Sequence, residues 1–186
     1  MKKIQTIFKR DWENNGGVLN QYTYFLFPDG LLTCKPTEKL DGTNVRITVR
    51  NHIVVRVEKR RNPDKIQKHK GIEEPWYKDI DEFSPEDKWV VDGVRNTDFS
   101  SIPDGEWSGE LVGPNIQGNP LGLENNRIVF FTLNQAPEIE NVPIDFEGLK
   151  EWLPEQKSRY GNGNIEGIVW HCPDGSMYKI KTKDFK

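Results

Sequence analysis

The most regular pattern in the chain is an alternation of polar and apolar side chains over Thr43–Arg50. Val45, Ile47 and Val49 share one face of this segment with Thr43, and the residues between them are polar. Because successive side chains of a strand point to opposite faces, the pattern predicts a strand with one buried face. Asn51-His52 then predicts a tight turn into a second strand at Ile53–Val57, which makes a β-hairpin.

Other stretches rich in β-branched and aromatic residues predict further strands at Tyr22–Phe27, Trp107–Val112, Arg127–Leu133, Asn164–Trp170 and Ser176–Lys181. The Ser84-Pro85-Glu86-Asp87 segment and Asp145 each have the residues that typically begin a helix. Strands outnumber helices and follow one another as hairpins, so we expect an α+β fold with antiparallel β-sheets and flanking helices. No repeat or linker divides the chain, and residues 1–186 are predicted to form a single domain.

Composition excludes several classes of protein. With 34% hydrophobic and 30% charged residues, the chain has the composition of a globular protein and has no apolar run long enough to span a bilayer. No apolar stretch follows the first lysines, so we expect no targeting signal, a cytoplasmic location and no membrane partner. Cys34 and Cys172 have no metal-ligand spacing and are expected to be two ordinary thiols in a reducing compartment.

The net charge of −3 hides an uneven distribution of charge. Basic residues are concentrated at Lys59–Lys70 and again in a C-terminal cluster formed by Lys179, Lys181, Lys183 and Lys186. Such runs are typical either of a solvated surface or of a site for phosphates, and charge alone does not separate the two.

A candidate nucleophile lies just before the first predicted hairpin, in the segment Glu38-Lys39-Leu40-Asp41-Gly42-Thr43-Asn44. A glycine in such a turn allows a close approach of the backbone to another group. The pattern Lys-x-Asp-Gly is short and is also typical of an exposed lysine before a surface turn. Its interpretation therefore depends on the rest of the chain.

Five further segments follow in a fixed order: Lys59-Arg60-Arg61-Asn62, Gly109–Pro114, Arg127–Phe131, Ile165–Val169 and Tyr178–Lys181. Together with the Lys39 segment they resemble the motifs of the covalent nucleotidyltransferase superfamily, which contains polynucleotide ligases and RNA capping enzymes. The resemblance implies a ligase-type adenylyltransferase (ATP-grasp-like) domain. It also implies ATP as co-substrate and Mg²⁺ as the metal.

The resemblance implies a role for each matched position. Lys39 would be the catalytic lysine that becomes adenylated, Glu166 would bind the metal, and Asn44 would support the later steps on RNA. The expected ATP-binding residues are Glu38, Lys39, Arg60, Arg61, Glu110, Phe130, Lys179 and Lys181. Two choices stay open: one of Arg60 and Arg61 would contact the ribose, and one of Phe130 and Phe131 would stack on the base, with Phe130 favoured by its spacing from Glu110.

Within the superfamily the chain is most similar to RNA ligases. Gly109–Gln117 resembles phage ligases that repair double-stranded RNA, and Asn115–Leu123 and Ile165–Gly175 resemble a compact RNA ligase family represented in vertebrates. That resemblance implies joining of RNA 5′-phosphate and 3′-hydroxyl ends, with RNA as the partner and no protein partner. It also implies no C-terminal oligonucleotide-binding domain. The alternatives are a DNA ligase, a GTP-dependent capping enzyme, or a binding module without catalysis.

Overall fold

The computed structural model describes residues 3–24, 29–131 and 136–186. The chain forms two compact units, which we describe separately. Unit 1 contains Asp41–Ala136, and unit 2 contains Lys3–Leu40 together with Pro137–Lys186. The single domain expected for residues 1–186 stays a prediction.

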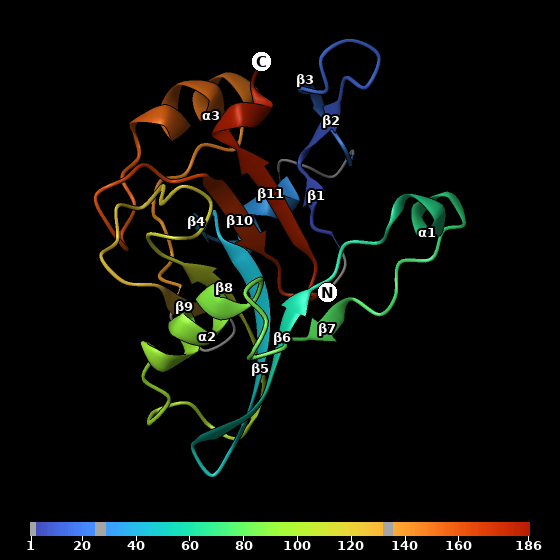
Figure 1. Cartoon of the computed structure of the whole chain (residues 1–186). Helices are drawn as coiled ribbons and strands as arrows, with labels where there is room; N and C mark the ends of the chain where they lie inside the picture. Colours follow the sequence, from blue (N-terminus) through green and yellow to red (C-terminus); the bar gives the residue numbers. More distant parts are fainter. Residues whose placement is uncertain (1–2, 25–28, 132–135) are drawn as a thin grey trace. The chain divides into compact units, whose positions relative to one another are not determined.

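Unit 1 is built on a five-stranded antiparallel sheet with the order β7-β6-β5-β8-β9. The strands are β5 (Thr43–Arg50), β6 (Ile53–Arg60), β7 (Tyr77–Asp79), β8 (Gly105–Val112) and β9 (Arg127–Phe130). Helix α2 (Lys88–Arg95) packs against β8 and β9, and the short helix α1 (Lys65–His69) lies at the end of the loop that connects β6 with β7 (Figure 1).

The alternating segment of the sequence forms β5 as predicted. Val45, Ile47 and Val49 are fully buried, and they form the core of unit 1 with residues of α2, β8 and β9. The Asn51-His52 turn is also confirmed, since both residues have positive φ angles. The predicted α+β class with antiparallel hairpins is therefore observed in this unit.

The predicted helix at Ser84–Asp87 begins later than expected. Residues 84–87 form a turn and α2 starts at Lys88, with no capping hydrogen bond from the Asp87 side chain. The Asp87 carboxylate instead pairs with Lys59 and accepts a hydrogen bond from the backbone NH of Asp81 at 2.9 Å. Asp87, which the sequence placed in the first turn of the helix, is therefore engaged in a tertiary ion pair instead.

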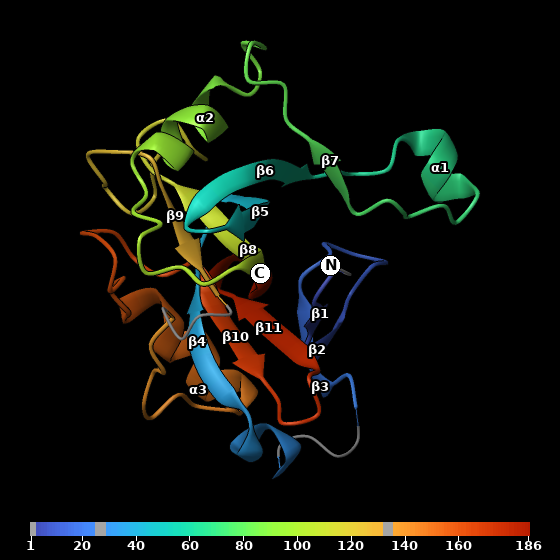
Figure 2. The same cartoon turned by 90° about the horizontal axis from the view of Figure 1, so that it is seen from below.

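Unit 2 is built on a four-stranded sheet with the order β1-β11-β10-β4, in which only the β1–β11 pair is parallel. The strands are β1 (Gln5–Thr6), β4 (Lys35–Lys39), β10 (Gly167–His171) and β11 (Met177–Lys181), and β2 (Phe8–Arg10) pairs with β3 (Val18–Tyr22) as a separate hairpin. Helix α3 (Phe146–Trp152) begins at Asp145, which caps it as predicted. Figure 2 shows α3 next to strands β4 and β10. Leu149 of this helix belongs with Ile168 and Ile180 to the buried core of the unit.

Short 3-10 turns complete unit 2 at Asp29–Thr33, Leu153–Glu155 and Thr182–Asp184. Two predicted strands extend beyond the described residues, because positions 25–27 and 132–133 lie outside them. The sequence did not predict strands β1, β2, β4 and β7 or helix α1, and of β3 it predicted only Tyr22. In the described part of the chain no helix is both long and apolar enough to cross a membrane.

The prediction of two ordinary thiols is wrong for this structure, because Cys34 and Cys172 form a disulfide. Strands β4 and β10 are antiparallel, with Lys35 opposite His171, and one further step brings Cys34 opposite Cys172. Their Cα atoms are 4.1 Å apart although 138 positions separate them in the sequence. Only the strand register, which the sequence did not provide, reveals this pairing.

We expect the disulfide to stabilise the fold, because it closes a loop of 138 residues and limits the unfolded chain. The double variant Cys34→Ser/Cys172→Ser should lose about 2–5 kcal/mol of unfolding free energy in denaturant titrations. A reductant should lower the Tm of the wild-type protein and leave that of the double variant unchanged. Two free thiols in protein purified without reductant would contradict the pairing.

Candidate active site

Two of the predicted lysines lie on the same face of the unit 2 sheet, at one end of strands β4, β10 and β11. Lys39 on β4 and Lys181 on β11 lie opposite Gly167 of β10, one on either side. Directly opposed residues project from the same face of a sheet. A Cβ atom on Gly167 would lie 2.0 Å from the carbonyl oxygen of Ile180, so only glycine allows β11 to approach this closely.

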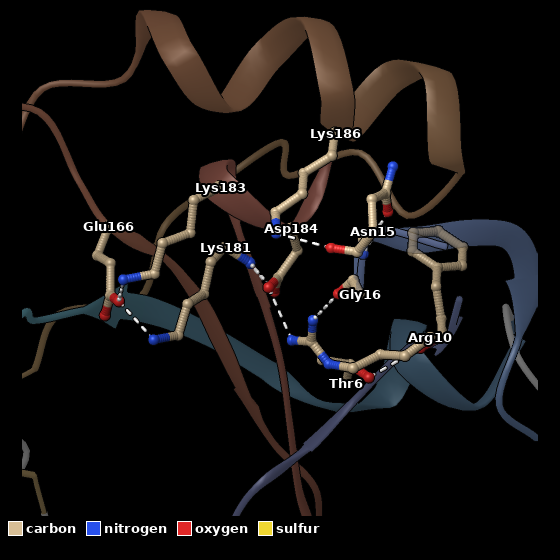
Figure 3. Close-up of polar contacts among 11 residues, drawn as sticks. Thr6, Arg10, Asn15, Gly16, Glu166, Lys181, Lys183, Asp184 and Lys186 are labelled. Carbon is tan, nitrogen blue, oxygen red and sulfur yellow. Dashed lines mark hydrogen bonds and ion pairs between the residues drawn. The ribbon is translucent and has the colours of Figure 1, made fainter. Parts of the chain in front are cut away.

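Glu166, which immediately precedes β10, joins these lysines. Its Oε2 pairs with Lys39 Nζ, and its Oε1 lies 2.5 Å from Lys181 Nζ and 3.3 Å from Lys183 Nζ. Figure 3 shows Lys181 and Lys183 directed at this carboxylate. The Glu166 side chain is only 7% exposed, so three ammonium groups surround a nearly buried carboxylate.

The charges fix the ionised state of this carboxylate. Burial would raise the pKa of Glu166, but the positive charge of Lys39 and the hydrogen bonds from Lys181 and Lys39 lower it below its usual range. Glu166 is therefore an anion at neutral pH. It orients the lysines but neutralises only one of their charges.

Lys179 projects from the same face of β11 as Lys181, two positions away. Burial and then the positive charges of Lys181, Lys39 and Lys3 lower the pKa of Lys179 from 10.5 to about 8, with Asp184 opposing the shift. A lysine disfavoured in its charged form by neighbouring cations would be stabilised by a bound anion. The lysine cluster, defined as Lys39, Lys179, Lys181 and Lys183, thus has the electrostatics of a phosphate-binding site.

Glu38 is not part of this cluster. It precedes Lys39 on β4, and its side chain therefore projects from the opposite face of the sheet. It is 5% exposed, its Oε2 accepts a hydrogen bond from the backbone NH of Arg159 at 3.0 Å, and burial raises its pKa. The structure favours a role for Glu38 in fixing the 158–159 loop beneath β4.

Unit 1 carries the remaining predicted residues on its own sheet. Asn44 of β5 lies opposite Glu110 of β8, so the two side chains project from the same face, away from Val45 and Ile47. Asn44 Nδ2 donates to the Gly109 carbonyl at 3.1 Å, and its Oδ1 accepts a hydrogen bond from the Tyr77 hydroxyl at 2.7 Å. Tyr77 thereby holds Asn44 in one orientation.

The strand register separates Arg60 from Arg61. Arg60 lies opposite Tyr77, on the Asn44 face, and its guanidinium is 5.7 Å from the centre of the Trp76 ring. Arg61 instead donates to Gln67 Oε1 at 2.5 Å and to the carbonyls of Glu73, Glu74 and Pro75. Arg61 therefore holds the loop around α1, and Arg60 is the better candidate for a ligand contact.

The same reasoning separates the two phenylalanines. Phe130 lies opposite Gly109, is 0% exposed and packs in the core with Phe99. Phe131, the next residue, has its backbone NH 3.3 Å from the Ser108 carbonyl and projects from the Asn44 face, where it is half-buried. A fully enclosed ring offers no surface to a base, so the structure favours Phe131 over Phe130, which the sequence had preferred.

Sequence reasoning missed a polar network beside Asn44. Arg46 makes two hydrogen bonds of 2.7 Å to Glu58 and stacks on Tyr77, with its guanidinium 4.6 Å from the ring centre. These residues line a cavity of about 600 Å³ together with Trp76. The strict alternation in β5 placed Arg46 on this face, but its partners on β6 and β7 depend on pairing.

The sequence had also left Lys183 without a role. It was counted in the C-terminal basic cluster, but no matched motif included it. The signal was its spacing, because Lys179, Lys181 and Lys183 recur at every second position.

In the described residues no group of three His, Cys, Asp or Glu side chains forms a metal site. A single carboxylate such as that of Glu166 is compatible with Mg²⁺, because this ion commonly binds one or two carboxylates together with substrate phosphates and water.

Solved structures of RNA ligases have a fold similar to that of this chain. Over 96% of this chain and 59% of the other, it is similar to a mutant of Naegleria gruberi RNA ligase solved with ATP and Mn, with a TM-score of 0.52 and 14% identity. A structure of Naegleria gruberi RNA ligase with PPi matches 81% of this chain and 49% of that one, with a TM-score of 0.52 and 16% identity. The chain therefore has a fold similar to that of these RNA ligases, and the predicted α+β fold class is confirmed.

The sequence comparisons match the C-terminal part of the chain to one family of RNA ligases. Residues 105–185 match the family described as RNA ligase 1. RNA ligase 1 of Rattus norvegicus and of Pongo abelii are 39% and 42% identical to this chain over 74 residues. Each match covers 38% of this chain and 22% of the relative, so only a fraction of the relatives' length is represented. The predicted resemblance to RNA ligases is confirmed over this region.

The two phenylalanines provide a matched pair of variants. Phe130→Ala should cost about 3–5 kcal/mol of stability, because it leaves a cavity in the core. Phe131→Ala should largely retain the Tm and weaken binding of an adenine nucleotide by about 1–3 kcal/mol, the range for base stacking on an aromatic side chain. Calorimetry would measure both effects. The reverse pattern would return the stacking role to Phe130.

The lowered pKa of Lys179 predicts a specific pH dependence of stability. Because its folded-state pKa of about 8 lies below 10.5, the unfolded chain binds the proton more tightly. The cost of the buried charge is full below pH 8 and disappears as the pH rises towards 10.5. Lys179→Met should therefore raise the Tm relative to wild type near neutral pH, and this gain should shrink towards pH 10.

The exposed Lys186 supplies the control, because Lys186→Met should change the Tm by the same amount at each pH. A difference between wild type and Lys179→Met that does not vary with pH would show that Lys179 has an ordinary pKa.

Proposed function

We propose that this protein is an ATP-dependent RNA ligase that joins 5′-phosphate and 3′-hydroxyl RNA ends through a lysyl-AMP intermediate. The observation that carries the proposal is the ion pairing of Glu166, which immediately precedes β10, with Lys39 of β4 and Lys181 of β11. This arrangement presents an amine nucleophile within a cluster of cations. The family match and the ligase-type fold support it.

In the first reaction, the neutral amine of Lys39 attacks the α-phosphorus of ATP. The N–P bond forms, the bond from the α-phosphorus to the bridging oxygen breaks with its electron pair leaving on pyrophosphate, and the amine nitrogen loses a proton. Lys181 and Lys179 stabilise the negative charge on the α-phosphate oxygens. Lys39 pairs with Glu166 as an ammonium, so it must leave that pair and release one proton to water before its amine can attack.

In the second reaction, an oxygen of the RNA 5′-phosphate attacks the phosphorus of lysyl-AMP. The P–N bond breaks and Lys39 leaves as a protonated amine, which can then pair again with Glu166. In the third, the RNA 3′-hydroxyl attacks the activated 5′-phosphorus, AMP departs and the hydroxyl proton is released. Each step transfers a phosphoryl group by positioning and charge stabilisation.

The remaining roles are proposed from the resemblance, and side-chain placement supports the choice of Arg60 over Arg61 and of Phe131 over Phe130. Arg60 and Glu110 are assigned to the ribose, Phe131 to the adenine and Asn44 to the RNA-dependent reactions. Mg²⁺, which would be held by Glu166, would supply charge neutralisation at the phosphates. Relatives of this fold solved with ATP and Mn support the choice of ATP and of a divalent metal.

Labelling of the protein tests the first reaction and separates an ATP-using ligase from a GTP-using capping enzyme and from a binding module without catalysis. With Mg²⁺, α-labelled ATP should label the wild-type protein, and α-labelled GTP should not. Lys39→Ala should lose all label, whereas Lys157→Ala, an exposed lysine of the same unit, should retain it. Labelling from GTP would indicate a capping-type enzyme, and no label from either nucleotide would contradict every enzymatic version.

A further inference from the structure

The turn that follows β11 brings an additional lysine to the lysine cluster. Lys183 lies in the 3-10 turn Thr182–Asp184, and its Nζ is 3.3 Å from Glu166 Oε1, the same oxygen that Lys181 contacts. Its side chain is 66% exposed, against 18% for Lys39 and 19% for Lys181. Lys183 therefore occupies the solvent-facing edge of the cluster.

The turn is fixed at both ends. Asp184 is 4% exposed; its Oδ2 accepts a hydrogen bond from the Lys181 backbone NH at 3.0 Å, and its Oδ1 accepts one from Arg10 at 2.7 Å. At the other end the ring of Phe185 packs on that of Phe146, with centroids 5.1 Å apart. Because the backbone on both sides is held, Lys183 starts from a defined position.

The pairing of β10 and β11 continues into this turn. The backbone NH of Thr182 donates to the Glu166 carbonyl at 3.0 Å, which places the residue before Lys183 beside the central carboxylate. Arg10 also donates to the Gly16 carbonyl at 2.8 Å and so ties the β2–β3 hairpin to the same turn (Figure 3). Arg10 and Asp184 are positioning residues for the lysine cluster.

The charges of the cluster require a polyanion. Three lysines, Lys39, Lys181 and Lys183, pair with the one carboxylate of Glu166, and Lys179 adds a fourth positive charge close to Lys39 and Lys181. Asp184 nearby is already paired with Arg10, so one phosphate group would not balance this excess of positive charge. Under the proposed function Lys39 and Lys181, which are adjacent across Gly167, act on the reacting α-phosphate. Lys183 is then left at the open edge, where the rest of a triphosphate would extend.

We propose that Lys183 binds the β- and γ-phosphates of ATP and then the departing pyrophosphate. This inference rests on the proposed function, since it concerns the leaving group of the adenylation reaction. When the bond from the α-phosphorus breaks, the electron pair moves onto the pyrophosphate oxygen. The Lys183 ammonium stabilises that developing charge by a charge-assisted hydrogen bond.

The test uses Lys183→Ala, Lys183→Arg and, as a matched control, Lys186→Ala, whose exposed ammonium donates to the Asn15 carbonyl. Lys183→Ala should raise the ATP concentration that half-saturates lysyl-AMP formation, or slow that reaction, by about tenfold to a hundredfold. Lys183→Arg should restore most of the activity, and Lys186→Ala should behave as wild type. All variants should keep the wild-type Tm.

Two further measurements separate the possible outcomes. Sealing of a pre-adenylated RNA, which bypasses ATP, should be unchanged in Lys183→Ala; a loss there together with normal adenylation would assign Lys183 to the RNA phosphate and overturn the proposal. Calorimetric titration with pyrophosphate alone should show weaker binding to Lys183→Ala than to wild type. If the wild-type protein bound pyrophosphate through Lys183 but formed no lysyl-AMP, the proposed function would fail, and with it the leaving-group role of Lys183; only its assignment as a pyrophosphate-binding residue would stand.

Discussion

The ion pairing of one nearly buried carboxylate with several lysines is the constraint on which the candidate site depends. Glu166 sits at the end of β10, where Gly167 lets the neighbouring strand approach, and it pairs with Lys39 from one side and Lys181 from the other. Without the carboxylate these ammonium groups would repel one another. With it, they are held on one face of the sheet but remain under-neutralised. Such a site is preorganised for phosphates, because the ligand supplies the charge that the protein lacks.

Much of the fold could be predicted because its signals are local. The alternation in β5 and the positive-φ turn at Asn51-His52 need no knowledge of distant residues, and both are observed. Features that depend on register were not predictable in the same way. The Cys34–Cys172 disulfide follows from the pairing of β4 with β10, and the ion pair of Asp87 with Lys59 likewise joins residues that only the tertiary structure brings together.

The site shows the same division. The resemblance selected Lys39, Glu166 and Lys181, and the structure brings these three together. It could not choose between adjacent residues such as Phe130 and Phe131, since alternation tells only that they face opposite ways. The buried core identifies the inward face and leaves Phe131 as the candidate. Lys183 escaped notice because a turn, rather than a strand motif, brings it to Glu166.

Mapping of the adenylated residue tests the central claim, that Lys39 is the nucleophile, most directly. Protein incubated with ATP and Mg²⁺ would be digested, and the peptides analysed by mass spectrometry. A single adenylyl group on the peptide that contains Lys39, lost after mild acid treatment as expected of a phosphoramidate, is the predicted result. An adenylyl group on Lys179, Lys181 or Lys183 instead, or no adenylated peptide at all, would contradict it.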